Sequence, residues 1–355
     1  MPERAWPDAG EGKRMSTQPA FTPTRRAVLL AGGGALLARP SPAQGTWQPQ
    51  RPVEFVVAAG PGGGTDQFAR TVQSIIQKHN LMRGSVIVTN KGGGAGTEAF
   101  VYGRSVAGDP HKVIFGTNNV WLMPLVTRVG YSLSDLRPIA SMAADEFILW
   151  THADAPWRTA RDLVNAMRER GAGFRMAGSQ ARDTDHILTK LIERASGASV
   201  TYVPFRSGGE AAIQLAGAHA DANTNNPAEN VAQWRAGRVR PLCVFNTRRL
   251  SLTEKVHDGM GWSDIPTCVE AGIGPEEFRM PRTVWLPART TDAQAAFWTG
   301  ILSQVRQTPE WRAWLESGSQ SDLWQTGHDL ADFIRRDEAV NREHFREYGW
   351  LVQAE

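Results

Sequence analysis

The sequence has few of the residues that build metal sites. It holds only two cysteines, Cys243 and Cys268, among 355 residues. Of its eight histidines, His152, His186 and His219 are scattered without metal-ligand spacing, so no metal site is predicted. The two cysteines either form a disulfide in an oxidising compartment or remain free thiols, since Cys243 lies in the apolar run Pro-Leu-Cys-Val-Phe.

The apolar run near the N-terminus is too short to cross a membrane. It follows Arg25 and Arg26 and spans about 12 residues, whereas a bilayer requires roughly 20. Small residues at Ser41 and Ala43 complete a cleavage site, so residues 1–43 are predicted to be an export signal and leader that is removed. The paired arginines are typical of the twin-arginine route to the periplasm, with an ordinary secretory signal or a membrane anchor as alternatives. Translation starts either at Met1 or at Met15 within this leader.

The chain lacks an excess of charge once this leader is set aside. The leader carries six basic and three acidic residues, which leaves 33 residues of each sign in the remainder. The net charge of +3 therefore belongs to the leader, and the remainder has no block of lysine and arginine. This balance argues against nucleic acid as a partner.

Motifs of nucleotide binding and hydrolysis are absent. The glycine loop at 60–64 departs from the dinucleotide fingerprint because position 65 is threonine, and it lacks the Gly-Lys-Ser/Thr ending of a P-loop. No Gly-x-Ser-x-Gly sequence occurs. We therefore predict no cofactor and no enzymatic activity.

From Thr46 onward, short apolar runs alternate with amphipathic stretches. Strands are expected at 53–57, 85–89, 113–119, 147–150, 174–179, 200–205, 240–246 and 280–286, with helices between several of them and from 291 to 348. This alternation predicts an α/β fold with mostly parallel sheets and helices on both faces.

Glycine-rich and small polar residues follow the predicted strands. The loop at 60–64 leads into a helix, and such a helix start directs backbone N–H groups at an anion, although it also suits a plain strand-to-helix connection. We expect a bulky replacement of Gly63 or Gly64 to damage binding more than folding. Strand ends of an open α/β sheet converge on the ligand, which predicts a polar cleft. The candidate ligand-binding residues are Pro61, Gly62, Gly63, Gly64, Thr65, Asp66, Thr117, Asn118, Gly178, Ser179, Gln180, Arg182, His186, Arg206, Ser207, Gly208, Asn225 and Asn226.

These segments, in this order, resemble the substrate-binding receptors of tripartite tricarboxylate transporters, the Bug or TctC-like family. The resemblance runs from Arg51 to the C-terminus. It rests on Pro-Gly-Gly-Gly-Thr-Asp at 61–66, the glycine cluster at 90–96, Gly-Thr-Asn at 116–118, the segment 177–186, Val-Pro-Phe-Arg-Ser-Gly-Gly at 203–209, Trp-Arg-Ala-Gly-Arg at 234–238 and the segment 264–272.

The resemblance implies a periplasmic-binding-protein type II fold with two lobes. Residues 44–150 with 279–355 are expected to form the first lobe, and residues 151–278 the second. It further implies that a small organic carboxylate is held between the lobes by the first glycine loop and by 178–186, largely through backbone amides and bridging waters. A monomeric receptor of this kind delivers its ligand to the membrane permease subunits of the transporter.

One matching segment departs from the family's common Ser-Ser-Gly-x-Gly-Thr pattern. Gly178, Ser179, Gln180 and Arg182 stand where that pattern has Ser, Ser, Gly and Gly. Arg182 is either a bidentate partner for a carboxylate or a solvated loop arginine. The same alternatives hold for Arg206, and His186 either contacts the ligand or makes a structural hydrogen bond.

Other residues leave two interpretations open. Asn225 and Asn226 either donate to a carboxylate or form a turn. Trp121, Trp150 and Trp285 either wall a pocket or pack in the core.

Two other functions share these features. A sensor for a membrane kinase would have the same pocket, and an exported enzyme acting on a carboxylate would use Asp66, His186 and Glu210 as acid and base groups. The three groups are far apart in the sequence, which disfavours the enzyme.

Overall fold

The computed structural model describes residues 47–274 and 277–352, which belong to one compact unit. The expected export signal and its cleavage site lie outside these residues and stay a prediction. Among the described residues, no helix is both long enough and apolar enough to cross a bilayer.

The first sheet has six strands. Their order is β13 (Ser321–Thr326), β4 (Leu136–Asp145), β12 (Met280–Pro287), β3 (Lys112–Gly116), β1 (Val53–Val57) and β2 (Val86–Asn90). β1 pairs in parallel with β2 and β3, whereas β12 pairs antiparallel with β3 and β4, and β13 antiparallel with β4.

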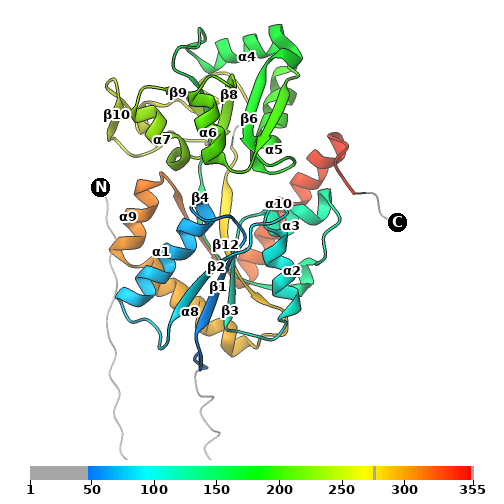
Figure 1. Ribbon diagram of the computed structural model, residues 1–355, viewed down its shortest axis with the longest axis vertical. Coiled ribbons are helices and arrows are strands. Elements are labelled where there is room, and N and C mark those ends of the chain that lie inside the picture. The colour runs from blue at the N-terminus through cyan, green and yellow to red at the C-terminus, as the bar shows by residue number, and fades with distance from the viewer. Residues whose placement is uncertain (1–46, 275–276, 353–355) are drawn as a thin grey trace, which may run out of the picture. The chain divides into compact units, whose positions relative to one another are not determined.

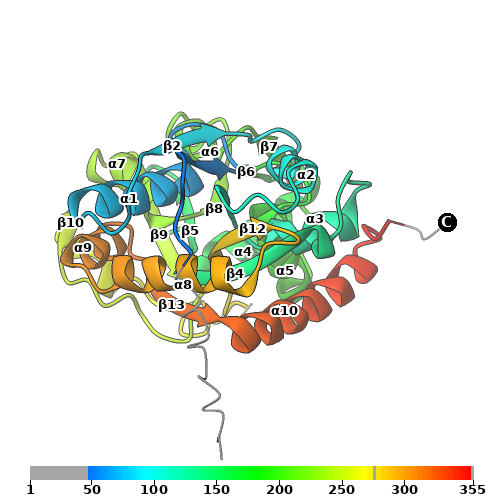
Figure 2. The ribbon, with the colours of Figure 1, turned by 90° about the horizontal axis from the view of Figure 1, so that it is seen from below.

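Helices cover both faces of this sheet because β1 alternates between two apolar clusters. Val53, Phe55 and Val57 pack into one cluster, whereas Val56 and Ala58 pack into the other. The first cluster includes residues of α1 (Gly64–Lys78), α8 (Asp292–Arg306) and α9 (Pro309–Ser317), and the second those of α2 (Thr97–Ser105), α3 (Asn119–Val126) and α10 (Gly327–Glu347), an arrangement visible in Figure 2.

The second sheet has five strands, in the order β7 (Thr201–Phe205), β6 (Arg175–Ser179), β8 (Ala222–Asn225), β5 (Ile148–His152) and β9 (Val239–Val244). Figure 1 shows its helices α4 (Ala160–Arg170), α5 (Thr184–Ser196), α6 (Gly208–Ala216) and α7 (Pro227–Arg235) gathered around it. A small two-stranded sheet, β10 (Lys255–His257) and β11 (Met260–Gly261), follows β9. Short 3-10 turns occupy Leu133–Asp135, Gly171–Gly173 and Trp262–Asp264.

The chain passes between the two sheets at the end of β4. Only Glu146 and Phe147 separate β4 in the first sheet from β5 in the second, and the chain returns to the first sheet at β12. The division into two lobes near residues 150 and 279 remains our proposal, and this topology supports it.

The α/β fold with helices on both faces is confirmed, but the strand pairing is more mixed than the alternation predicts. In the second sheet β6 pairs in parallel with β7 and β8, while β5 pairs antiparallel with β8 and β9. The antiparallel pairs involve the strands that carry the chain between the sheets, together with β13. Sequence periodicity gives no information on the direction of such strands.

Several strands were not expected, among them β4, β10, β11 and β13. β4 contains Pro138 and several alanines, which weaken its β signal. The region 291–348 is not helical throughout, because β13 interrupts it at the sheet edge with the polar sequence Ser-Asp-Leu-Trp-Gln-Thr.

The cysteines and tryptophans for which two interpretations were open pack in the core. Cys243 and Cys268 are free thiols, both fully buried. Trp121, Trp150 and Trp285 are at most 2% exposed and belong to the apolar clusters, and Trp121 also borders a hollow beside α3 and α10.

Candidate functional site

The first glycine loop is held in shape by Asp66. One carboxylate oxygen of Asp66 accepts the Gly62 N–H at 2.9 Å, and Asn90 Nδ2 donates to the other at 2.9 Å. Arg70 Nε donates to both oxygens, at 3.0 and 2.9 Å. Burial opposes ionisation of Asp66, but these bonds outweigh it and lower the pKa of the carboxyl. Asp66 is therefore engaged within the loop rather than free for a ligand.

The start of α1 leaves backbone donors open. Its N-cap, Gly63, offers no side chain to the first-turn N–H groups. Pro61 and Gly62 are exposed beside it, while Thr65 is buried and its hydroxyl accepts a bond from Arg282 Nη1 at 2.7 Å. The free N–H of Gly64 and the helix dipole give this end of α1 a positive potential.

The loop after β3 joins the second glycine cluster. Thr117 Oγ1 donates to Asn119 Oδ1 at 2.8 Å, and Asn119 Nδ2 donates to the Ala95 carbonyl at 2.6 Å. Asn118 is 1% exposed, and its Oδ1 has no hydrogen-bond partner among the described residues. Asn119, which the sequence analysis did not select, thus links two of the predicted loops.

Gly178 and Ser179 lie at the end of β6, where the loop into α5 begins. The Ser179 N–H and Oγ donate to Asp185 Oδ2 at 2.6 and 2.8 Å, while the Tyr202 hydroxyl donates to the Ser179 carbonyl. A side chain at Gly178 would overlap the Tyr202 hydroxyl and lie 2.6 Å from Asp185 Cβ, so this position requires glycine. Both residues serve the loop's own hydrogen bonds.

Gln180 and Arg182 stand where the common pattern has glycine, and both adopt a backbone conformation that glycine favours. Their φ angles are +21° and +63°, in the left-handed region that favours glycine. Arg182 Nη1 donates to the Val126 carbonyl at the end of α3, at 3.0 Å. The guanidinium therefore contacts a helix C-terminus, where a cation is favoured, and its role as a ligand contact stays a prediction.

This geometry gives a direct test at Arg182. Both Arg182→Gly and Arg182→Ala remove the bond to Val126, but only glycine relaxes the positive φ. We expect the glycine variant to be about 1 kcal/mol more stable than the alanine variant. Chemical denaturation of the two variants checks this, and equal stabilities would show that the loop carries no backbone strain.

His186 is a packing residue. Its ring stacks on Tyr202 with centroids 4.0 Å apart and contacts Trp350 at 4.5 Å, while Nδ1 accepts the Arg182 N–H at 3.1 Å. Burial first, and then Lys190 and Arg182, lower the pKa of His186 to about 4. A neutral ring fixed on both sides makes the structural hydrogen bond, as one of the two interpretations predicts.

Asp185 gives this region a pH dependence. Burial raises its pKa to about 8, against the opposing bonds from Ser179. The folded state then binds a proton that the unfolded state releases above pH 4, so this carboxyl lowers stability as the pH rises from about 4 to about 8. We expect Asp185→Asn to become more stable than the wild type toward pH 8 and the difference to shrink toward pH 4. Thermal melts across this range measure it, and a constant difference would contradict the assigned shift.

The loop at 206–210 forms a capping arrangement at α6. Ser207 Oγ accepts the Glu210 N–H at 3.2 Å, and Glu210 Oε2 accepts the Arg206 N–H at 3.1 Å. The Arg206 side chain is exposed and lines an open hollow together with Gln180 and the glycine cluster at 92–95. Gln180 and Arg206 are thus brought together at this hollow.

The two asparagines after β8 differ in their roles. Asn225 is 1% exposed, and its Nδ2 donates to the Gly208 carbonyl and to Asn230 Oδ1, both at 2.8 Å, so it ties α6 to α7. Asn226 Nδ2 donates to the Glu146 carbonyl at 3.1 Å, at the point where the chain changes sheet. Asn226 alone of the two reaches the cavity described next.

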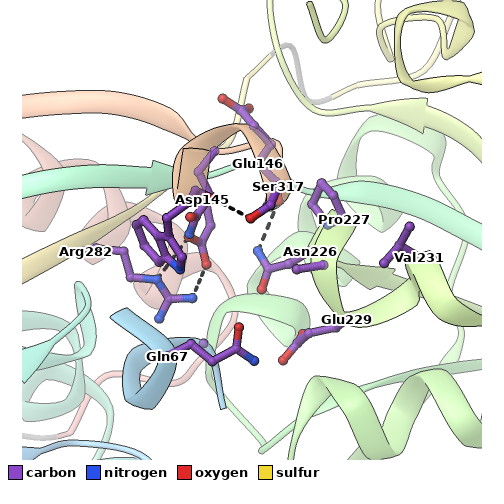
Figure 3. A pocket seen from close by; sticks show the side chains of 14 residues that line it. Gln67, Asp145, Glu146, Asn226, Pro227, Glu229, Val231, Arg282 and Ser317 are labelled. Atoms are coloured by element: carbon purple, nitrogen blue, oxygen red, sulfur yellow. Dashed lines mark hydrogen bonds and ion pairs between the residues drawn. The ribbon is translucent and has the colours of Figure 1, made fainter. Parts of the chain in front are cut away.

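A cavity of about 200 Å³ lies where elements of both sheets meet (Figure 3). The start of α1 and the start of α7 border it, as do the end of β4, β12 and the segment that follows α9. Its lining consists of Gly64, Gln67, Asp145, Glu146, Asn226, Pro227, Ala228, Glu229, Val231, Arg282, Trp314, Ser317, Gly318 and Gln320. Of the sequence-predicted residues, it brings together Gly64 and Asn226.

A buried ion pair forms one wall of this cavity. Arg282 is 4% exposed and Asp145 1%; Arg282 Nε donates to Asp145 Oδ1 at 3.0 Å, and Nη2 to Oδ2. Gln320 Nε2 also donates to Asp145 Oδ1. Neither charged residue was predicted from the sequence, although an arginine within the apolar run Met-Pro-Arg-Thr-Val-Trp-Leu is a signal of a paired buried charge.

Two further carboxyls border the cavity. Ser321 Oγ and Asn246 Nδ2 donate to the Glu146 carboxylate, the latter at 2.8 Å, and burial raises the pKa of Glu146 despite these bonds. Burial also raises the pKa of Glu229 to about 7, with Arg282 acting against the rise and Asp145 adding to it. Over residues 47–274 and 277–352, no group of three histidine, cysteine or carboxylate residues is arranged to hold a metal.

Comparisons with known proteins agree on the family. The model of the tripartite tricarboxylate transporter family receptor matches residues 68–346. Protein BugT of Bordetella pertussis is 24% identical over 271 residues, which are 74% of this chain and 79% of BugT. A protein of Cupriavidus necator from the gbd 5' region is 25% identical over 256 residues, 70% of this chain and 73% of the relative.

Solved structures share the fold. Rpa4515 of R. palustris, solved with adipate, has a TM-score of 0.77 at 23% identity and covers 85% of this chain and 99% of its own. MatC of Rhodopseudomonas palustris, with bound malate, has a TM-score of 0.69 at 20% identity and covers 83% and 99%. The periplasmic binding protein BugD has a TM-score of 0.74 at 20% identity and covers 86% and 100%. With a family model matching most of its length and a shared receptor fold, this chain belongs to the tripartite tricarboxylate transporter receptor family.

Proposed function

We propose that this receptor captures a small organic carboxylate in the periplasm and delivers it to the membrane permease subunits of a tripartite transporter. The observation that carries the proposal is the meeting of two helix N-termini at one cavity. Neither Gly63 before α1 nor Asn226 before α7 caps its helix through a side chain, and residues at both helix starts line the cavity. Uncapped N-termini stabilise an anion through N–H groups and helix dipoles.

The solved relatives support the same ligand class. Adipate and malate, which accompany two of them, are small carboxylates. The helix α1 follows a strand of the first sheet, and α7 follows a strand of the second. A ligand bound between the two helix starts would therefore favour the closed arrangement of the two proposed lobes. No constellation of the described acidic groups with a nucleophile favours an enzyme, and Asp66 and His186 are engaged in structural bonds.

A thermal-shift screen of the purified protein tests the ligand class. The screen compares organic acids with neutral sugars and polyamines. A carboxylate ligand at a hundredfold excess over its Kd is expected to stabilise the protein by about 2.7 kcal/mol, which raises the melting temperature by several degrees. Shifts from sugars or polyamines alone, with every carboxylate silent, would contradict the proposal.

Delivery to a permease requires a separate test. A strain lacking this receptor is expected to lose growth on the bound acid as sole carbon source and to regain it on complementation. If uptake of the acid were unchanged while its transcriptional response disappeared, the receptor would serve a sensor kinase instead.

A further inference from the structure

The cavity at the sheet junction is more acidic than a pocket for a dicarboxylate should be. Asp145, Glu146 and Glu229 line it, and Arg282 is the cation among its lining residues (Figure 3). A second ligand carboxylate placed here would meet like charges in a partly desolvated space, which is unfavourable. Which of these charged groups a ligand can contact depends on which of them already have partners within the protein.

Arg282 uses three of its N–H donors within the protein wall. Nε and Nη2 are bonded to Asp145, and Nη1 donates to Thr65 Oγ1 at 2.7 Å. Because its charge is neutralised within the wall, Arg282 orders the start of α1 rather than anchoring a ligand anion. The backbone N–H of Gly64 at the start of α1 remains an open anion donor.

The Glu146 carboxylate also accepts hydrogen bonds from other residues of the protein. Ser321 binds one of its carboxylate oxygens, and Asn246 binds the other. Neither partner lines this cavity, and the Glu146 carboxylate is satisfied without a ligand.

Glu229 is different, because its carboxylate makes no hydrogen bond or ion pair with any residue of the described ranges. Its side chain points into the cavity from the first turn of α7, facing Gln67 and Arg282 (Figure 3). The carboxylate lies against Gly208 at the start of α6: a Cβ at that position would overlap Glu229 Oε2 and lie 2.8 Å from Cδ. Glu229 is thus a partly buried acceptor without a partner among the described residues.

We infer that Glu229 determines specificity by accepting a hydrogen bond from a protonated amine, so that the ligand is a carboxylate that also carries an ammonium group. This inference rests on the proposed function. The ligand carboxylate lies at the start of α1, and its ammonium group lies at Glu229 across the cavity. A charge-assisted bond satisfies Glu229, whereas a dicarboxylate of the same length leaves two carboxylates opposed.

The test is calorimetric titration of the mature protein with probes of matched length. Butyrate, succinate, 2-aminobutyrate and 4-aminobutyrate form one series, and hexanoate, adipate, 2-aminohexanoate and 6-aminohexanoate form the other. We expect one of the amino acids to bind the wild type at least about tenfold more tightly than the acid without the amine, the usual effect of a hydrogen bond to a charged group.

Variants assign this preference to Glu229. Glu229→Gln keeps the size of the side chain and is expected to remove the preference for the amine and to raise the affinity for the dicarboxylate, because the opposing charge is gone. Glu229→Asp, which keeps the charge, should retain part of the preference. Glu254→Gln removes an exposed carboxylate from the same part of the chain and should change nothing. The melting temperature of each variant shows whether it is folded.

The outcomes separate this inference from the proposed function. Tightest binding of succinate or adipate, or an amine preference that survives Glu229→Gln, would overturn the inference and leave the carboxylate receptor intact. Absence of binding by every acid of both series, with shifts from sugars or polyamines, would overturn both.

Discussion

Replacement of Arg282 by alanine is expected to lower the free energy of unfolding by about 3–5 kcal/mol, because it leaves a buried carboxylate without its cation. Asp145 is 1% exposed and makes two bonds to Arg282, and only Gln320 would remain to satisfy it. Thr65 would lose its donor as well, so the start of α1 would lose its support from β12.

Denaturant unfolding measures this loss against a matched control. Arg235 pairs with Glu254 on the surface, with both side chains more than half exposed, and Arg235→Ala is expected to change stability by less than about 1 kcal/mol. The double variant Arg282→Gln with Asp145→Asn should recover part of the loss, since it removes both charges. Equal losses in Arg282→Ala and Arg235→Ala would show that the buried pair is not a structural element.

Replacement of Gly64 by alanine is expected to impair both folding and binding. An added Cβ would overlap Arg282 Nη2 and lie 3.0 Å from Cζ, so the guanidinium must leave its position against Asp145. Overpacking of this kind destabilises by about 1–3 kcal/mol, and loss of the ion pair brings the effect to the upper end of this range. The methyl group would also enter the cavity beside the open N–H groups, so ligand affinity should fall as well.

Gly63 supplies the control for Gly64. A Cβ there would meet only the Gly60 carbonyl at 3.3 Å and the Ala59 side chain at 3.9 Å, and the backbone φ of −71° suits alanine. Gly63→Ala should therefore remain stable within about 0.5 kcal/mol. The sequence grouped the two glycines together, whereas the structure separates them, because Arg282 comes from a strand more than two hundred residues away. Equal stabilities of the two variants would contradict the packing described at Arg282.

The local elements that frame the site could be predicted from the sequence. The β-branched run at 53–57 and the glycine loop after it predict β1, the turn and α1, and the structure has them in this order. The same holds for the strand ends near 178 and 205. These features depend on residues that are neighbours in the chain, so periodicity and turn chemistry are sufficient to find them.

The cavity itself could not be predicted in this way. Asp145 and Arg282 are 137 positions apart, and Glu229 lines the same cavity from α7, which follows a strand of the second sheet. Only the tertiary arrangement brings them together, and nothing in the local pattern of β4 marks Asp145 as buried. Conversely, Ser179, His186 and Asn225 have the composition of ligand donors, but their polar atoms satisfy the protein's own loops.

Native mass spectrometry of the receptor purified after export tests the central claim most directly. The account predicts a non-covalent complex with one small organic acid, which denaturation releases chemically unchanged and which mass and fragmentation identify as a carboxylate carrying an amine. Release of a carboxylate without an amine would retain the receptor and reject the role of Glu229. A bound neutral sugar, or an acid that the protein converts into another compound, would contradict the account of a carboxylate receptor.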